Sequence, residues 1–287
     1  MLKTRVITAL VILPIVLIAL FAFPVWAWAM FAVGIAMVAC WEWSRLSQMN
    51  ASQAVFFLVG SLLIATAICV ATFRPDGGME FAAFKRPVLA IAVVFWMIAA
   101  PLWLANTWHP GSMWLRGLTG WVVIFPMAVA LISLREISPW LLLSFAAIVW
   151  VADIAAYFVG RRFGRHKLAP AISPGKTLEG VAGGLAGVVL FFFAWQFLTT
   201  NLAINAQPWV LELHAHRFAL FALFVVLALV SVLGDLFESW MKRGAGMKDS
   251  SNLLPGHGGV LDRIDALTST LPLAALYVMF MLPLHGN

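Results

Sequence analysis

The sequence is poor in cysteine and in charged residues. Its two cysteines, Cys40 and Cys69, lie inside apolar runs and have no partner at CxxC or Cys/His spacing, so neither a disulfide framework nor a thiolate metal site is indicated. Only 10% of the 287 residues are charged, whereas 63% are hydrophobic. This balance lies far outside the range of soluble domains and indicates a polytopic membrane protein.

Two further features are missing. The net charge is +6, but no soluble basic segment is long enough to form a nucleic-acid domain, so we predict no nucleic-acid partner. The sequence also lacks a convincing Ser/His/Asp or Cys/His constellation, so it does not predict a protein nucleophile. The chemistry therefore has to come from the few charged residues, which gather in two stretches of the second half.

Apolar runs long enough to cross a bilayer, about 20 residues each, recur along the chain. The first run, residues 1–23, resembles a signal peptide, but its apolar core of about 18 residues is longer than a usual signal core, so we interpret it as an uncleaved span. The other runs cover residues 25–46, 53–73, 87–105, 118–134, 138–160, 177–199, 217–241 and 264–284. The sequence thus predicts an all-α, polytopic integral membrane protein with about nine transmembrane helices.

The distribution of Lys and Arg predicts the orientation. With the N-terminus inside, 13 of the 18 Lys and Arg residues are cytoplasmic and 5 are outside, and cytoplasmic loops normally carry this excess. Both long polar loops, residues 161–177 and 242–263, then lie on the cytoplasmic face. Polar chemistry begins only near residue 150, so we divide the chain into a transmembrane scaffold, 1–137, and a catalytic region, 138–287. In the scaffold we interpret Glu42 and Arg45 as an ion pair.

The more informative stretch is residues 231–265, which holds five of the twelve acidic residues. Charge at membrane depth is costly unless it is paired or functional. At helical spacing one narrow polar face is formed by Ser231, Asp235, Glu238, Ser239 and Lys242. Asp262 and Asp265 are three residues apart and project from one side of the next helix. Ordinary charges at a helix end are the alternative for single residues, but the cluster suits a phosphate chain that carries a divalent metal.

The second stretch is residues 150–180. Asp153 lies inside the sixth span, and a lone carboxylate there needs a cation or a partner. Gly175-Lys176-Thr177 is not a Walker A loop, because that motif needs glycine where this chain has Pro170; it is better interpreted as a phosphate seat at a helix N-terminus. We expect Glu179 to pair with Lys176 or to bind metal. The glycines at 180, 183, 184 and 187 have GxxxG spacing, which fits close helix packing inside the chain or at a homodimer interface.

A sequence signature in the first of these stretches resembles a known family. It consists of Ser239-x-x-Lys242-Arg243, then Lys248-Asp249, then LPGHGGVLDRID at residues 254–265. It closely resembles the signature of the phosphatidate cytidylyltransferases, the CDP-diacylglycerol synthases, without a departure. The Asp153 helix and SPGKTLEG at residues 173–180 also look like this family's, whereas the first half agrees only in hydrophobicity and number of spans.

The resemblance implies that CTP and phosphatidate are converted to CDP-diacylglycerol and pyrophosphate at the inner membrane of a bacterium. It implies one or two Mg²⁺ ions, and a monovalent cation could join them. On this hypothesis the metal ligands are Asp153, Asp235, Asp249, Asp262 and Asp265. The catalytic residues are Asp235, Asp262, Asp265, Lys242 and Arg243. The substrate-binding residues are Lys176, Thr177, Ser239, Lys248, Gly256, His257, Gly258, Gly259 and Arg263.

Two alternatives stay open at this point. A CTP-dependent polyprenol kinase would use similar groups but would transfer the γ-phosphoryl group and release CDP. A non-enzymatic transporter would use intramembrane Asp and Lys residues to bind an ion or a lipid phosphate. Transporters commonly have paired halves with interrupted helices in corresponding places, and here the polar sites are confined to the second half.

Overall fold

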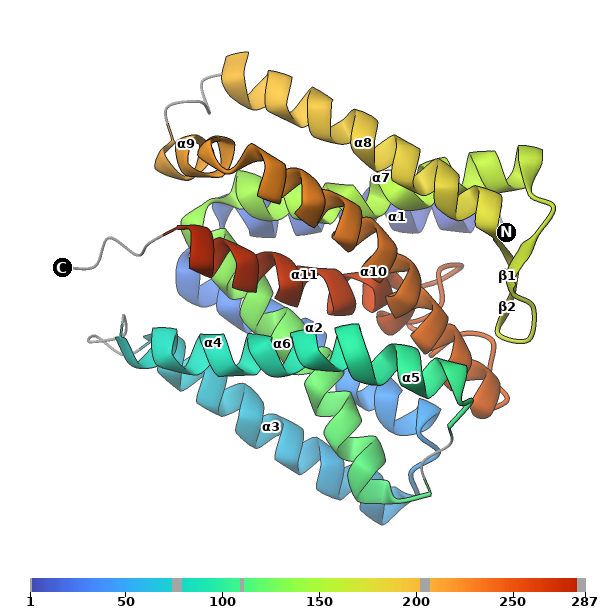
Figure 1. Ribbon diagram of the computed structural model, residues 1–287. Coiled ribbons are helices and arrows are strands. Elements are labelled where there is room, and N and C mark those ends of the chain that lie inside the picture. The colour runs from blue at the N-terminus through green and yellow to red at the C-terminus, as the bar shows by residue number, and fades with distance from the viewer. Residues whose placement is uncertain (1, 74–78, 109–110, 202–206, 283–287) are drawn as a thin grey trace.

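The computed structural model describes residues 2–73, 79–108, 111–201 and 207–282, and it is almost entirely helical (Figure 1). The helices of the first half are α1 (Leu2–Ala22), α2 (Val25–Leu46), α3 (Ala51–Phe73), α4 (Met79–Val94), the π-helical turn η1 (Phe95–Ala99), α5 (Ala100–Ala105) and α6 (Met113–Ile137). Those of the second half are α7 (Pro139–Phe163), α8 (Leu178–Asn201), α9 (Pro208–Ala215), α10 (Arg217–Gly244) and α11 (Leu261–Met281).

The described helices confirm an all-α, multi-pass membrane protein. Eight of them are long and apolar enough to cross a bilayer, if α4, η1 and α5 are taken as one span from Ala83 to Ala105. The ninth predicted span corresponds to α1, whose apolar part, Val6–Ala22, is shorter. Each of the predicted runs therefore has a helix, and α1 begins on the side opposite to that on which α11 ends (Figure 1).

The centre of the bundle is formed by α6 and α11. Helix α6 packs against α2, α3, α4, α7 and α11, and α11 packs in turn against α4, α7 and α10. Small residues such as Ala128 and Ala274 are fully buried there, which lets the helices approach closely. Large apolar side chains such as Leu63, Leu190 and Phe218 are instead exposed on the outside, as expected of a surface that faces lipid.

The glycines of α8 pack against α7. A Cβ atom at Gly183 would collide with Val159, and one at Gly187 would lie 2.6 Å from Cβ of Ala155. The GxxxG spacing is therefore used for helix packing within one chain, as in the first of the two interpretations. A homodimer would have to form through another surface.

A short hairpin connects α7 to α8, where the sequence predicts only a loop. Strands β1 (Lys167–Ala169) and β2 (Ser173–Thr177) pair antiparallel. The carboxylate of Glu179 accepts hydrogen bonds from the backbone N–H groups of Arg165, at 3.0 Å, and His166, and it pairs with Nδ1 of His166 at 2.6 Å. Glu179 thus ties the hairpin to α8 and, contrary to one expectation, does not pair with Lys176.

Candidate active site

One face of α10 carries the polar stripe that the sequence predicts. The Ser239 hydroxyl donates to Oδ1 of Asp235 at 3.2 Å, and Lys242 pairs with Glu238 one turn away. The opposite face is apolar, because Phe237 packs its ring against Trp96 and Trp103. Helix α10 therefore separates a charged site from an aromatic core.

The hairpin brings the second polar stretch to this stripe. Nζ of Lys176, in β2, lies 2.6 Å from Oδ2 of Asp235. Asp153 of α7 and Asp265 of α11 are close enough to Asp235 for its negative charge to act on both. Three carboxylates from three helices, with one lysine among them, thus come together from positions up to 112 residues apart in sequence, from Asp153 to Asp265.

These three carboxylates have few polar partners. Oδ1 of Asp265 accepts from the Ala266 N–H at 2.8 Å, and Asp235 has only Ser239 and Lys176. Asp153 has no hydrogen-bond or ion-pair partner among the described residues. A carboxylate can accept about four hydrogen bonds. We therefore call Asp153, Asp235 and Asp265 the open carboxylates, since each keeps acceptor capacity for a ligand.

Asp262 differs, although it is only one turn from Asp265. Its Oδ1 lies 2.7 Å from Nζ of Lys242. Its Oδ2 accepts from the N–H of Ser250 at 2.9 Å, from the hydroxyl of the same serine at 2.9 Å and from the N–H of Gly259 at 2.7 Å. The side chain is only 2% exposed. Asp262 thus stabilises the loop before α11, and its oxygens have little capacity left for a metal ion.

A second carboxylate that accepts several hydrogen bonds from the loop comes from the first half of the chain. Glu42, at the end of α2, is fully buried. It accepts hydrogen bonds from the hydroxyls of Ser250 and Ser251 and from the N–H groups of Val260 and Leu261. We call Glu42 and Asp262 the bound carboxylates, because each has four donors within hydrogen-bond distance. The Ser250 hydroxyl, which has one hydrogen, is shared between the two.

This role of Glu42 was not predicted from the sequence. The predicted ion pair with Arg45 is wrong, since the Arg45 guanidinium lies over the Trp41 ring, 5.1 Å from its centroid, and Glu42 faces the loop instead. The available signal was an acidic residue inside an apolar run, which is costly at membrane depth. The division at residue 137 therefore does not separate all polar groups that touch the site.

The glycine-rich loop makes a tight turn. Gly256 and Gly258 have φ of 76° and 81°, which other residues rarely adopt. The N–H of Leu254 donates to the Gly258 carbonyl, and the N–H of His257 donates to the Leu254 carbonyl, both at 2.8 Å. With the Gly259 N–H on Asp262, much of the backbone of this loop is engaged within the loop or with the bound carboxylates. An anion therefore has fewer backbone donors here than the sequence predicts.

The remaining predicted residues fall into two sets. Thr177 is buried, and its hydroxyl accepts from the Gly180 N–H at 3.1 Å, so it caps α8 rather than lying open to a ligand. Arg243, Lys248, Asp249 and Arg263 are exposed around the loop. His257 is half-buried, and its Nδ1 has no hydrogen-bond partner in the described part of the chain. Of the exposed groups, Arg243 donates from Nε to the Ile172 carbonyl of the hairpin at 3.4 Å.

No closed metal site is present among the described residues, since no three His, Cys, Asp or Glu side chains lie close enough together to hold an ion. Two lysines instead neutralise part of the cluster, Lys176 at Asp235 and Lys242 at Glu238 and Asp262. Glu238 is buried and was not among the predicted site residues. It shares Lys242 with Asp262 and so links α10 to α11.

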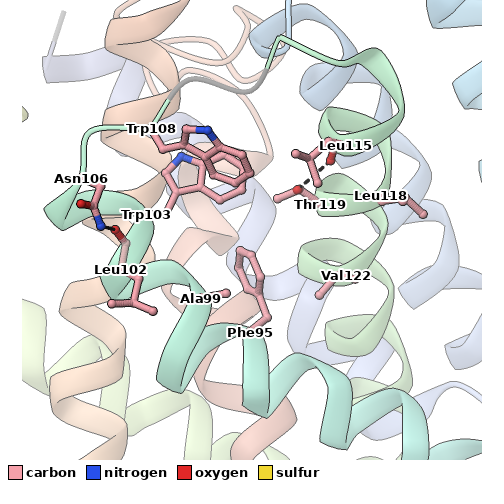
Figure 2. Close-up of a pocket in the computed structure, with 10 residues that line it drawn as sticks. All are labelled: Phe95, Ala99, Leu102, Trp103, Asn106, Trp108, Leu115, Leu118, Thr119 and Val122. Carbon is pink, nitrogen blue, oxygen red and sulfur yellow. Dashed lines mark hydrogen bonds between the residues drawn. The ribbon is translucent and has the colours of Figure 1, made fainter.

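An apolar pocket lies on the other side of α10. It has a volume of about 460 Å³ and uncharged walls from η1, α5, the residues just after α5, and α6. Figure 2 shows Phe95, Trp103 and Trp108 on one side of it and Leu115 and Thr119 on the other. Its lining suits hydrocarbon rather than a nucleotide, and two of its walls, Phe95 and Trp103, contact Phe237 on the aromatic face of α10.

Comparison with known proteins places the whole chain in one family. Residues 3–281 match the cytidylyltransferase family. The chain is 35% identical over 297 residues to a phosphatidate cytidylyltransferase of Haemophilus influenzae, covering 98% of this chain and 100% of the relative. It is 38% identical over 280 residues to the one of Pseudomonas aeruginosa, with 96% of each chain covered. A match to the one of Thermotoga maritima is 42% identical over 132 residues, 46% of this chain and 45% of the relative.

Proposed function

The chain belongs to the cytidylyltransferase family, and we infer that it transfers the cytidylyl group of CTP to phosphatidate, giving CDP-diacylglycerol and pyrophosphate. The observation that carries this inference is the similarity to phosphatidate cytidylyltransferases over nearly the whole chain. The site agrees with it chemically, because it offers cationic and carboxylate groups and no nucleophile.

The reaction needs no protein nucleophile. The phosphate monoester of phosphatidate is largely dianionic near neutral pH, so one of its oxygens can form the new bond to the α-phosphorus of CTP. The bond between that phosphorus and the oxygen bridging it to the β-phosphorus breaks, and pyrophosphate leaves with the electron pair. The protein has to align the two phosphates and to offset their negative charge.

Lys176 and Lys242 are the groups best placed to offset that charge. Lys176 is 23% exposed at its side chain and has one described partner, Asp235. Lys242 is 14% exposed and is already held by two carboxylates. We therefore assign contact with the CTP phosphates to Lys176 first, and to Lys242 the fixing of α10 to α11. Positive electrostatic potential near the loop before α11 is added by the exposed residues Arg243, Lys248 and Arg263.

Magnesium dependence is part of the proposal. The open carboxylates supply oxygen ligands only, which is the donor set that Mg²⁺ prefers, and each keeps acceptor capacity. Since no three described carboxylates lie close enough together to hold an ion by themselves, one or two of Asp153, Asp235 and Asp265 would hold each ion together with phosphate oxygens of the substrate. The charge of the ion would polarise those phosphate oxygens. Full activity in excess EDTA would contradict this assignment, whereas we expect loss of activity that Mg²⁺ restores.

We also propose that the site faces the cytoplasm from the inner membrane of a bacterium. Support comes from the excess of Lys and Arg on that side, 13 of 18, and from the bacterial relatives. A cysteine introduced at exposed Asn252, in the loop before α11, should react with a membrane-impermeant maleimide in inverted vesicles and not in intact cells. The opposite pattern would reverse the orientation.

The decisive test of the reaction measures which product carries the labelled α-phosphorus of CTP. Purified protein in detergent is incubated with phosphatidate, Mg²⁺ and CTP labelled on the α-phosphorus. We expect the label in a lipid product that forms only when phosphatidate is present. Label that stays in soluble CDP would favour the kinase alternative, and unchanged CTP with folded protein would favour transport.

A further inference from the structure

We propose that Glu42 is a positioning residue for the reaction: its buried carboxylate holds residues 250–261 and the first turn of α11 where the site requires them. The role in the reaction depends on the proposed function, whereas the positioning itself depends only on the contacts described below. Glu42 touches neither the open carboxylates nor Lys176 among its hydrogen-bond partners, so it acts through the loop.

The contacts of Glu42 reach both ends of the loop. At one end its carboxylate accepts from the hydroxyls of Ser251, at 2.6 Å, and Ser250, at 3.2 Å. At the other end it accepts from the N–H groups of Val260, at 2.9 Å, and Leu261, at 2.6 Å. One side chain thus closes the segment that contains the glycine-rich turn.

The two backbone contacts lie at the N-terminus of α11. A helix leaves its first N–H groups without intrahelical partners, and a negative charge near them is favourable. Glu42 provides both the acceptor and the charge from a different helix, α2. Asp265 is in the first turns of α11, so the direction in which its carboxylate points depends on this anchored end.

The glycine-rich loop packs directly against the Glu42 carboxylate. A Cβ atom at Gly259 would collide with the Glu42 carboxylate and with the Ser250 hydroxyl. Ser250 also donates a hydrogen bond to Asp262, and Asp262 in turn pairs with Lys242 of α10. The bound carboxylates therefore form one chain of polar contacts from α2 through the loop to α10. These contacts fix the loop and the two helices relative to one another.

The experiment compares Glu42→Gln with two other variants. Glutamine keeps the size of the side chain but replaces one acceptor oxygen by a donor that faces N–H groups. Trp43→Phe is the matched control, because the neighbouring Trp43 indole N–H donates to the Arg116 carbonyl of α6 at 2.9 Å and, among the described residues, has no hydrogen bond to the loop. Ser251→Ala removes one of the four donors from the loop side. Steady-state kinetics and hydrogen exchange of peptides covering 250–261 are measured on monodisperse protein.

For Glu42→Gln we expect kcat to fall at least tenfold and the KM for CTP to rise at least threefold, with faster exchange in 250–261. A loss of folded protein alone would lower the rate and leave the KM unchanged, as we expect for Trp43→Phe. Adding Ser251→Ala to Glu42→Gln should cost less than Ser251→Ala costs in the wild type, because both changes break the contact between Ser251 and Glu42. What remains is the loss of the Ser251 hydroxyl as acceptor for the Leu253 N–H, at 3.1 Å.

Three results would overturn the proposal. They are wild-type kinetics in folded Glu42→Gln, a loss of activity without faster exchange in 250–261, and full additivity of Glu42→Gln with Ser251→Ala. If Glu42→Gln fails to fold, Ser251→Ala alone decides: faster exchange with a raised KM supports the proposal, and wild-type behaviour rejects it. Failure of the proposed function is separate, since it would appear as wild-type protein that does not convert CTP and phosphatidate.

Discussion

Glu42 and Asp262 each accept contacts from four donors, whereas Asp153, Asp235 and Asp265 each have two polar partners or fewer. Both kinds occur on α11, where Asp262 is bound and Asp265 is open. Carboxylates in this protein thus have two distinct roles. The bound carboxylates fix the backbone of the loop, and the open carboxylates keep acceptor capacity for a cationic ligand or for one that carries phosphate together with a cation. Sequence spacing does not distinguish them, because Asp262 and Asp265 are three residues apart.

The strongest test of the comparison is Asp265→Asn. Asparagine keeps an acceptor for the Ala266 N–H but removes an open charge, so kcat should fall roughly 10²- to 10³-fold, as for other electrostatic groups at reaction centres. The thermal unfolding midpoint in detergent should stay at the wild-type value, because no four-donor contact is lost. Near-normal turnover in this variant would mean that the reaction does not need the charge of Asp265. Glu212→Gln in α9 is the control.

Asp262→Asn should show the opposite balance. The change breaks the ion pair with Lys242 and places a donor against buried N–H groups. Disrupting a buried pair from one side costs about 3 kcal/mol or more, so we expect the unfolding midpoint to fall well below that of Asp265→Asn. Differential scanning fluorimetry of both proteins makes the comparison, and equal midpoints would end the distinction between bound and open carboxylates.

Lys176→Ala sharpens the comparison from the cationic side. It removes the ion-pair partner of Asp235 and a positive charge assigned to the CTP phosphates, so the dissociation constant for CTP should rise about tenfold. Lys167→Ala is the matched control in the same hairpin, because the Lys167 ammonium donates to the Pro174 carbonyl, at 2.8 Å, and pairs with no carboxylate among the described residues. An unchanged affinity for CTP, measured by titration, would return Lys176 to a structural role.

Ser239→Ala should have the smallest effect. The hydroxyl donates one hydrogen bond of 3.2 Å to Asp235, and such a bond contributes about 1 kcal/mol. We expect kcat to change less than about fivefold, with stability unaffected. A loss as large as that of Asp265→Asn would mean that Ser239 contacts substrate directly and does more than orient Asp235.

Much of this could be predicted because it is local. Runs of apolar residues long enough to span a bilayer fall within single helices, and each predicted run has a helix in the described structure. The polar face of α10 follows from helical periodicity, so Asp235, Ser239 and Lys242 were found together. The glycines of α8 were correctly assigned to helix packing, because small residues at this spacing allow close approach.

The rest depends on contacts between distant segments. Glu42 contacts Leu261 across 219 residues of sequence, and no local pattern announces such a pair. A nearby opposite charge, Arg45, offered a simpler partner, but side chains on the same helix can point to different neighbours. Glu179 was misjudged for the same reason, since the hairpin carries Lys176 away to α10.

The sequence by itself thus determined the environment of the protein, its helices, the stretches that carry charge and, through the signature, the family. Length, hydropathy and spacing act within one helix or loop, where chain connectivity already sets the geometry. Only the tertiary structure decided which carboxylates are bound and which are open. Hydrogen bonds form between the groups that packing brings within about 3 Å. The packing of α2, α10 and α11 selects Glu42 and Asp262 as acceptors for the loop and leaves Asp153, Asp235 and Asp265 with few partners among the described residues.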